Sequence, residues 1–254
     1  MKRKDRNFYT GGIYHIYQRG NNKAYIFDDP IDKATFVNII KRTIGKYPCH
    51  LLYYVLMDNH YHLMVEMMDV EISHMMHEIN RRYSQYYNKK YNRCGTIYGD
   101  RFKSNIVPDT TYFLKLLQYI ANNPVKAGLV RHPSQYQWSA HMEMVSKQSM
   151  LIDKNRLLSY FGFSFSSAVK SYMANIECSV NDIIEFADVK AAAAATTVAT
   201  VSAAAESVSG TSHASQTIEA KFRKIEPGSI IEGLPGNILG GQANAGYKQS
   251  AGCS

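Results

Sequence analysis

Two histidines flank a tyrosine in the segment MDNHYHLMVE, which runs from Met57 to Glu66. The segment otherwise has the composition of a buried strand, and alternate side chains of a strand point to the same face. His60 and His62 are therefore neighbours on one face, with Cα atoms about 7 Å apart, so their imidazoles could bind one metal ion. Glu66 shares this face but lies roughly 13 Å beyond His62, which makes it a poor third ligand. Two half-exposed histidines hydrogen-bonded to solvent are the simpler alternative.

A tyrosine and an asparagine, Tyr119 and Asn123, lie four residues apart in TTYFLKLLQYIANNPVKAGLV. The periodic apolar residues of this segment predict a helix that starts at Asp109 or Thr110 and is broken by Pro124. Tyr119 and Asn123 then stack on one face, at the edge of the apolar stripe, where a phenol could act as a nucleophile. Because the chain has 19 tyrosines, Tyr119 could equally be an ordinary residue of the core edge. Asn123 could likewise end the helix ahead of the proline.

Strands and helices alternate through the first half of the chain in an order that predicts its fold. Hydrophobic periodicity predicts strands at 11–20 and 95–108, a β-hairpin at 50–66, and helices at 29–45, 69–88 and 109–124. The β-α-β-β-α-β order, followed by one more helix, is typical of a ferredoxin-like split-βαβ sandwich. We therefore predict an α+β fold with an antiparallel sheet, helices on one face, and the other face free for a ligand.

Composition divides the chain into three parts: a domain at 1–130, short amphipathic pieces at 131–190, and a tail at 191–254. The middle part predicts a small helical extension. The last part, rich in Ala and Ser and then in Gly, predicts a low-complexity linker and a disordered tail. Residues 1–130 carry 19 Lys and Arg against 11 Asp and Glu, whereas 131–254 carry 10 of each. A polyanion would thus bind the first part, although the same charge would also suit a merely solvated surface.

Several function classes are not expected from this sequence. It has no apolar run of membrane-spanning length, and no apolar segment follows its charged N-terminus, so we expect a cytoplasmic protein without a membrane partner. Cys49, Cys94, Cys178 and Cys253 form no CxxC pair. They are expected to be free thiols rather than a disulfide framework or a structural zinc site.

Three segments together resemble the single-tyrosine (HUH) transposases of small bacterial insertion sequences, especially the REP-associated tyrosine transposases. They are MDNHYHLMVE, RRYSQYYNKKYNRCGTIYGDRFKSNIV and YFLKLLQYIANNPVKAGLV, which stand in the family's order. The resemblance implies a ferredoxin-like fold, a homodimer, and a DNA transposase that cleaves and rejoins single-stranded DNA near hairpins through a 5′-phosphotyrosine intermediate. It implies that Tyr119 is the nucleophile, that His60 and His62 hold a divalent metal, and that Asn123 completes the metal site. It implies no nucleotide cofactor.

The chemistry of these residues is consistent with that implication. Two neutral imidazoles and one amide leave a divalent ion its full charge and open positions for phosphate oxygens. Mn²⁺ tolerates imidazole better than Mg²⁺ does, whereas abundance favours Mg²⁺, so both remain candidates. A phenol with a pKa of about 10 is mostly protonated at neutral pH, so a nearby cation or base must assist its attack.

Basic residues interleaved with aromatic ones predict where the DNA lies. In RRYSQYYNKKYNR and in DRFK, positive charge can hold phosphates while rings stack on bases. Tyr83 and Tyr86 fit the apolar stripe of their helix, so only the basic residues are assigned to DNA. They are Arg81, Arg82, Lys89, Lys90, Arg101 and Lys103.

Two alternative functions remain open. A non-catalytic nucleic-acid-binding module on the same fold would stack bases on its sheet and would need neither Tyr119 nor a metal. A related nickase for replication initiation would use a similar histidine pair and tyrosine. The YIANNPVKAG context favours the transposase, and the lack of a helicase or P-loop motif weakens the replication alternative.

Overall fold

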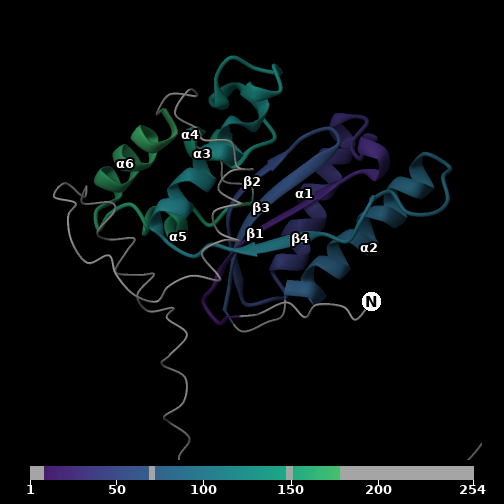
Figure 1. The fold of residues 1–254 in the computed structure, drawn as a ribbon, viewed down its shortest axis with the longest axis horizontal. Helices are drawn as coiled ribbons and strands as arrows, with labels where there is room; N and C mark the ends of the chain where they lie inside the picture. The colour runs from purple at the N-terminus through teal and green to yellow at the C-terminus, as the bar shows by residue number, and fades with distance from the viewer. Residues whose placement is uncertain (1–8, 69–71, 147–150, 178–254) are drawn as a thin grey trace, which may run out of the picture.

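A four-stranded antiparallel sheet forms the centre of the fold (Figure 1). The protein is described here by a computed structural model that covers residues 9–68, 72–146 and 151–177. The strands are β1 (Ile13–Arg19), β2 (Cys49–Leu56), β3 (His60–Met67) and β4 (Lys103–Ile106), in the order β2-β3-β1-β4. All three neighbouring pairs are antiparallel, with β1 and β3 in the middle. This is the strand order of a ferredoxin-like sandwich, so the predicted α+β fold class is confirmed.

Two helices, α1 (Pro30–Ile44) and α2 (Ile72–Lys90), cover one face of this sheet (Figure 1). The side chain of Asp29 accepts a hydrogen bond from the Asp32 amide and so caps α1, which begins at a proline as the sequence predicts. Tyr61 of β3 points to this face, where its ring lies 4.9 Å from that of Phe36 in α1. Its hydroxyl donates to Asn80 of α2. The odd-numbered residues of β3 therefore form the core with α1 and α2.

The opposite face of the sheet is covered in part by α3 (Thr110–Lys126). The Tyr119 ring of α3 lies 5.4 Å from the ring of His62, whose side chain points away from α1 and α2. Helices thus lie on both faces of the sheet, whereas the sequence predicted helices on one face only. The physical reason is that seven consecutive residues of β3 are buried, which requires cover on both faces of the strand.

Pro124 does not break α3, contrary to the prediction from sequence. The helix continues through it to Lys126, and only two helical residues follow the proline. Near a helix end a proline removes one backbone hydrogen bond without disrupting further turns. The side chain of Asn123 donates to the Tyr119 carbonyl at 3.2 Å. Asn123 is therefore a helical residue, one turn after Tyr119.

The predicted strand at 95–108 is much shorter than expected. Only Lys103–Ile106 pair with β1, and before them Tyr98 makes an isolated bridge to Gly20. Gly95 has a φ of +86°, a left-handed conformation that suits glycine and interrupts an extended strand. The residues between 95 and 103 therefore form a loop rather than a strand.

The helices after α3 lie at the β2 edge of the sheet, where the first two pack on β2 and the last packs on α3 (Figure 1). They follow the short 3₁₀ turn η2 (Pro133–Gln135) and are α4 (Ala140–Val145), α5 (Lys154–Leu158) and α6 (Phe165–Glu177). The Tyr54 hydroxyl of β2 donates to Glu143 of α4 at 2.7 Å, and the hydroxyls of Tyr53 and Tyr172 are 2.8 Å apart. Residues 131–146 and 151–177 thus complete the core with the sheet.

Some expectations fall outside the described residues. These are the helix start at Asp69, the tail at 191–254, and the thiols of Cys178 and Cys253. Cys49 and Cys94 are free thiols. Among the described helices none is long and apolar enough to cross a membrane.

Candidate active site

The central strands β1 and β3 bring a set of polar side chains to one face of the sheet. Tyr17 pairs with His62, and Arg19 pairs with His60. On the other side of β1, Tyr17 pairs with Lys103 of β4. Directly opposed residues of antiparallel strands share a face. The two histidines therefore lie beside an arginine and a lysine on the sheet surface that α3 partly covers.

His60 is held by Asn59, the residue before it in the turn between β2 and β3. Its Nδ1 lies 2.6 Å from Oδ1 of Asn59, whose Nδ2 donates to the Lys23 carbonyl in the 3₁₀ turn η1 (Asn21–Lys23). An amide oxygen can only accept, so the proton of the neutral imidazole is on Nδ1 and Nε2 has a bare lone pair. Burial, together with the charge of Arg19, lowers the pKa of His60 to about 4. The imidazole is therefore neutral at pH 7.

Asn123 presents an oxygen to that lone pair. Its Oδ1 lies 3.4 Å from Nε2 of His60, while its Nδ2 donates to the Tyr119 carbonyl. With the His60 proton on Nδ1, two acceptor atoms face each other, which is unfavourable unless a cation binds both. Among the described residues no three His, Cys, Asp or Glu side chains gather as a metal site. The Asn123 amide oxygen is a further oxygen donor close to His60. The pair of facing acceptors fits a divalent ion.

His62 is buried beside His60, and their rings are perpendicular with centroids 5.2 Å apart. Burial, followed by the proximity of His15 and His60, holds the pKa of His62 well below its ordinary value. Its Nδ1 lies 2.9 Å from Nε2 of His15 in β1. Both histidines of the pair are therefore neutral at pH 7, the form in which imidazole binds metals. Glu66 is not available to them, because its carboxylate is hydrogen-bonded to Arg156 of α5.

Tyr119 lies next to this pair. Its ring meets that of His62 edge to face at 5.4 Å, and the ammonium of Lys126 lies 5.7 Å from the ring centroid. Because Asn123 follows one helical turn later, α3 supplies both the phenol and the amide from a single face. The structure thus brings together the four residues that sequence assigns to the nucleophile and the metal site.

A pocket of about 600 Å³ opens at this point. It is lined by the four site residues and by charged side chains from β1, η1 and the loop and strand around 100–103. Those charged residues are Arg19, Lys23, Asp100, Arg101 and Lys103. Four cations and one carboxylate around neutral histidines favour a phosphate ligand.

Arg19, His15 and Lys126 were missed from sequence. The alternation in IYHIYQR, from Ile13 to Arg19, places His15, Tyr17 and Arg19 on one face of a strand. This signal identifies the set, but it does not reveal that the set faces the histidine pair. That information lies in the β1–β3 register. The Lys126 contact depends on the continuation of α3 beyond Pro124.

The six basic residues predicted to contact DNA lie in different surroundings. Arg101 and Lys103 line the pocket. Arg81 lines a neighbouring pocket of about 580 Å³, which shares Gln18 and residues 99–101 with the first. Arg82 pairs with Glu78 of its own helix, and Lys89 is exposed near the end of α2.

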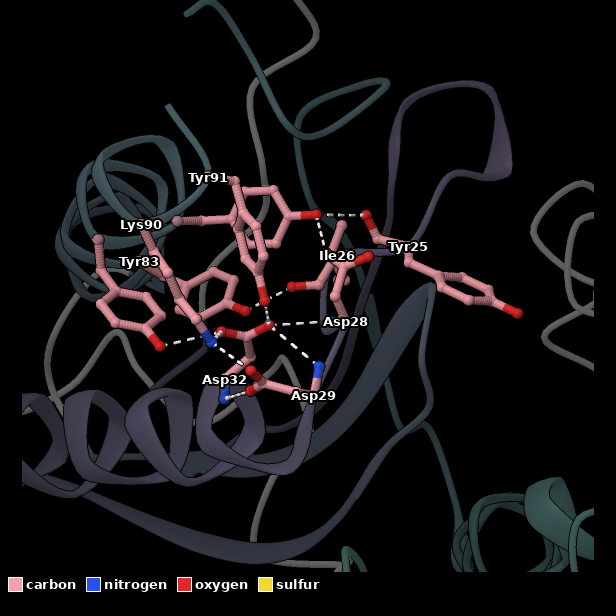
Figure 2. Close-up of polar contacts among 10 residues, drawn as sticks. Tyr25, Ile26, Asp28, Asp29, Asp32, Tyr83, Lys90 and Tyr91 are labelled. Carbon is pink, nitrogen blue, oxygen red and sulfur yellow. Dashed lines mark hydrogen bonds and ion pairs between the residues drawn. The ribbon is translucent and has the colours of Figure 1, made fainter. Parts of the chain in front are cut away.

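Lys90 is bound to carboxylates of α1 and its cap (Figure 2). Its ammonium lies 2.6 Å from Asp29 and 2.7 Å from Asp32, which is fully buried. Asp32 also accepts hydrogen bonds from Tyr86 and Tyr91. Burial favours the neutral acid, but the hydrogen bonds from Lys90 and Tyr91 outweigh it and lower the pKa of Asp32. The C-terminal end of α2 therefore binds to the N-terminal end of α1 through these contacts.

Comparison with known proteins was consistent with the sequence resemblance. Residues 9–123, which contain the four site residues, match the family model described as "Transposase IS200 like". A solved structure of a REP-associated tyrosine transposase bound to a REP hairpin is similar at 20% identity. It covers 58% of this chain and 87% of that chain, with a TM-score of 0.49. A crystal structure described as "a putative transposase" from Deinococcus radiodurans R1 is 14% identical. It covers 48% of this chain and 97% of that chain, with a TM-score of 0.35. No curated protein is significantly similar.

Proposed function

We propose, from the match of residues 9–123 to the model of the IS200-like transposase family, that the protein cleaves and rejoins single-stranded DNA through Tyr119. The phenol oxygen attacks a phosphodiester, forms a 5′-phosphotyrosine, and releases a 3′-hydroxyl. Attack of a 3′-hydroxyl on the phosphotyrosine then restores a DNA phosphodiester and frees the tyrosine. Each step exchanges one phosphoester for another, so no nucleotide cofactor is required.

One observation carries this proposal. Tyr119 lies beside a histidine pair, and Nε2 of His60 lies 3.4 Å from Oδ1 of Asn123. His60, His62 and Asn123 would hold a divalent ion, Mn²⁺ or Mg²⁺. When bound, such an ion polarises a phosphate oxygen and stabilises the charge that builds up on it. A non-catalytic binding module would have no use for a phenol placed against two neutral imidazoles.

The chain's own cations support the phenol and the phosphate. The Lys126 ammonium over the Tyr119 ring stabilises negative charge that develops on the phenol oxygen during attack. Arg101 and Lys103, at the pocket, hold the backbone phosphates of the substrate. We extend the proposal to hairpin-containing DNA and to a homodimer, as the sequence resemblance implies. The direct test is a covalent protein–DNA band on a denaturing gel, because a non-catalytic binding module leaves none.

DNA binding is expected to depend on the basic pocket and not on the C-terminal tail. A chain cut at residue 190 retains the helices that pack on β2, so it should fold and bind single-stranded DNA within about twofold of the full chain. With four phosphate contacts, from Arg19, Lys23, Arg101 and Lys103, affinity should fall roughly 50-fold between 50 and 200 mM salt. Fluorescence anisotropy measures both quantities. Loss of binding on removal of 191–254 would place the DNA elsewhere.

Arg101 and Lys90 are expected to differ sharply when each is replaced by methionine. Arg101→Met should weaken DNA binding and reduce the salt slope by about 0.7, the share of one phosphate contact, without changing stability. Lys90→Met should leave the slope unchanged and lower the free energy of unfolding, because it removes the ammonium that pairs with the buried Asp32 carboxylate. Urea unfolding and anisotropy, run on both variants, make the comparison. An equal effect of both substitutions on the salt slope would restore Lys90 to the DNA surface.

A further inference from the structure

His15 lies behind the histidine pair and is absent from the lining of the pocket. It is buried in β1 with 2% of its surface exposed, and its ring stacks on that of His62 with centroids 5.1 Å apart. Its Nε2 lies 2.9 Å from Nδ1 of His62. We propose that His15 is a positioning residue that fixes the tautomer of His62 so that the bare Nε2 of His62 is available to a metal ion.

The argument rests on which ring nitrogen of His62 carries the proton. A neutral imidazole has one N–H and one lone pair. If Nδ1 of His62 donates to His15, the Nε2 atom of His62 has its lone pair and can bind a cation. If His15 donates instead, the proton of His62 moves to Nε2 and the residue cannot bind a cation there. The direction of this single hydrogen bond therefore decides whether His62 is a ligand.

His60 shows why His62 needs such a partner. The Oδ1 atom of Asn59 can only accept, so the tautomer of His60 is set by an amide oxygen whose orientation the Lys23 carbonyl fixes. On His62 the partner of Nδ1 is another histidine, His15, whose Nε2 can either accept or donate a hydrogen bond. His15 acts as the counterpart of Asn59 when its Nε2 accepts. Both members of the pair then present Nε2, and outer partners of this kind orient metal-binding histidines in proteins generally.

His15 itself is poorly placed to be a third ligand. Its Nε2 is directed at the Nδ1 of His62, on the side of that ring away from Nε2, and its ring is stacked at an interplanar angle of 21°. A residue that bound the same ion would have to break this hydrogen bond. The geometry therefore assigns His15 to holding His62.

The test is a matched pair of variants, His15→Gln and His15→Met. Both side chains are unbranched and of similar length, but only glutamine offers an oxygen that can accept the Nδ1–H of His62. Mn²⁺ affinity, measured by isothermal titration, should fall 10- to 100-fold in His15→Met and stay within about threefold of wild type in His15→Gln. Thermal unfolding of both variants checks that they are folded.

A second measurement does not depend on metal binding. In ¹⁵N NMR spectra of the metal-free protein, assigned with a His62→Gln variant, His62 should be protonated on Nδ1 in wild type and in His15→Gln. It should populate both tautomers in His15→Met. Protonation on Nε2 in wild type, or equal loss of Mn²⁺ affinity in both variants, would overturn the proposal.

This inference rests on the proposed function, because it takes His62 to be a metal ligand. The Mn²⁺ titration and the NMR spectra distinguish failure of the proposed function from failure of the proposal for His15. If wild type binds no Mn²⁺, the metal site of the proposed function is contradicted, and the NMR spectra still decide whether His15 sets the tautomer of His62.

Discussion

Replacing Tyr119 with phenylalanine is expected to abolish covalent attachment to DNA and to lower strand cleavage by at least about 10³-fold. The substitution removes one oxygen, the atom that would form the bond to phosphorus. Packing should hardly change, because the ring that meets His62 edge to face at 5.4 Å is retained. DNA binding should stay within about twofold of wild type, since the cations that line the pocket are untouched.

The assay is a labelled single-stranded hairpin oligonucleotide incubated with protein and Mn²⁺, followed by a denaturing gel. Wild type should give a slow, protease-sensitive band, and Tyr119→Phe should give none. Two further variants complete the set. Tyr25→Phe, which alters an exposed tyrosine, should behave as wild type. Tyr17→Phe alters the other tyrosine that lines the pocket, and its band should persist.

The pattern of bands distinguishes the alternatives. A band that survives in Tyr119→Phe but disappears in Tyr17→Phe would make Tyr17 the nucleophile and contradict the assignment of α3. A wild-type protein that binds the hairpin but forms no band would favour the non-catalytic binding module. A replication-type nickase would also form the band. The band therefore does not separate a transposase from a nickase. The match of residues 9–123 to the IS200-like transposase family favours the transposase.

Sequence predicted the parts of the site that depend on local geometry. The period of a strand places His60 and His62 on one face, and the period of a helix places Asn123 one turn after Tyr119. Both relations need only a few consecutive residues. The strand order followed from the sequence of elements, since few topologies accommodate β-α-β-β-α-β.

What sequence could not predict depends on contacts between distant segments. Arg19 joins the site because β1 pairs with β3 in one register, and a shift by one residue would turn it to the other face. The sequence predicted that Lys90 contacts DNA, but in the fold its ammonium pairs with Asp29 and Asp32 at the start of α1. In both cases the residue type was informative, but the partner lay 41 or more positions away in the chain.

His60→Ala and His62→Ala are each expected to remove divalent-metal-dependent cleavage while leaving most DNA binding. Each substitution deletes an imidazole ligand, so Mn²⁺ affinity should fall by at least about 100-fold, as loss of a ligand exceeds the 10- to 100-fold effect of losing its outer partner. Asn123→Ala should weaken Mn²⁺ binding less, because a water molecule can take the place of a neutral amide oxygen. Isothermal titration gives the affinities, and anisotropy gives the DNA binding.

The matched control is His74→Ala, which removes an exposed histidine on α2, away from the pocket. It should bind Mn²⁺ as wild type does, and this excludes a nonspecific effect of losing any imidazole. Burial lowers the pKa of His60 to about 4, so protons should compete little with the ion above pH 5, and Mn²⁺ affinity should be nearly constant from pH 8 to pH 6. An exposed pair with an ordinary pKa near 6.5 would already lose affinity in that range. Unchanged Mn²⁺ binding in the double variant His60→Ala/His62→Ala would leave the two residues as ordinary strand histidines, and the facing acceptors of His60 and Asn123 would need another explanation.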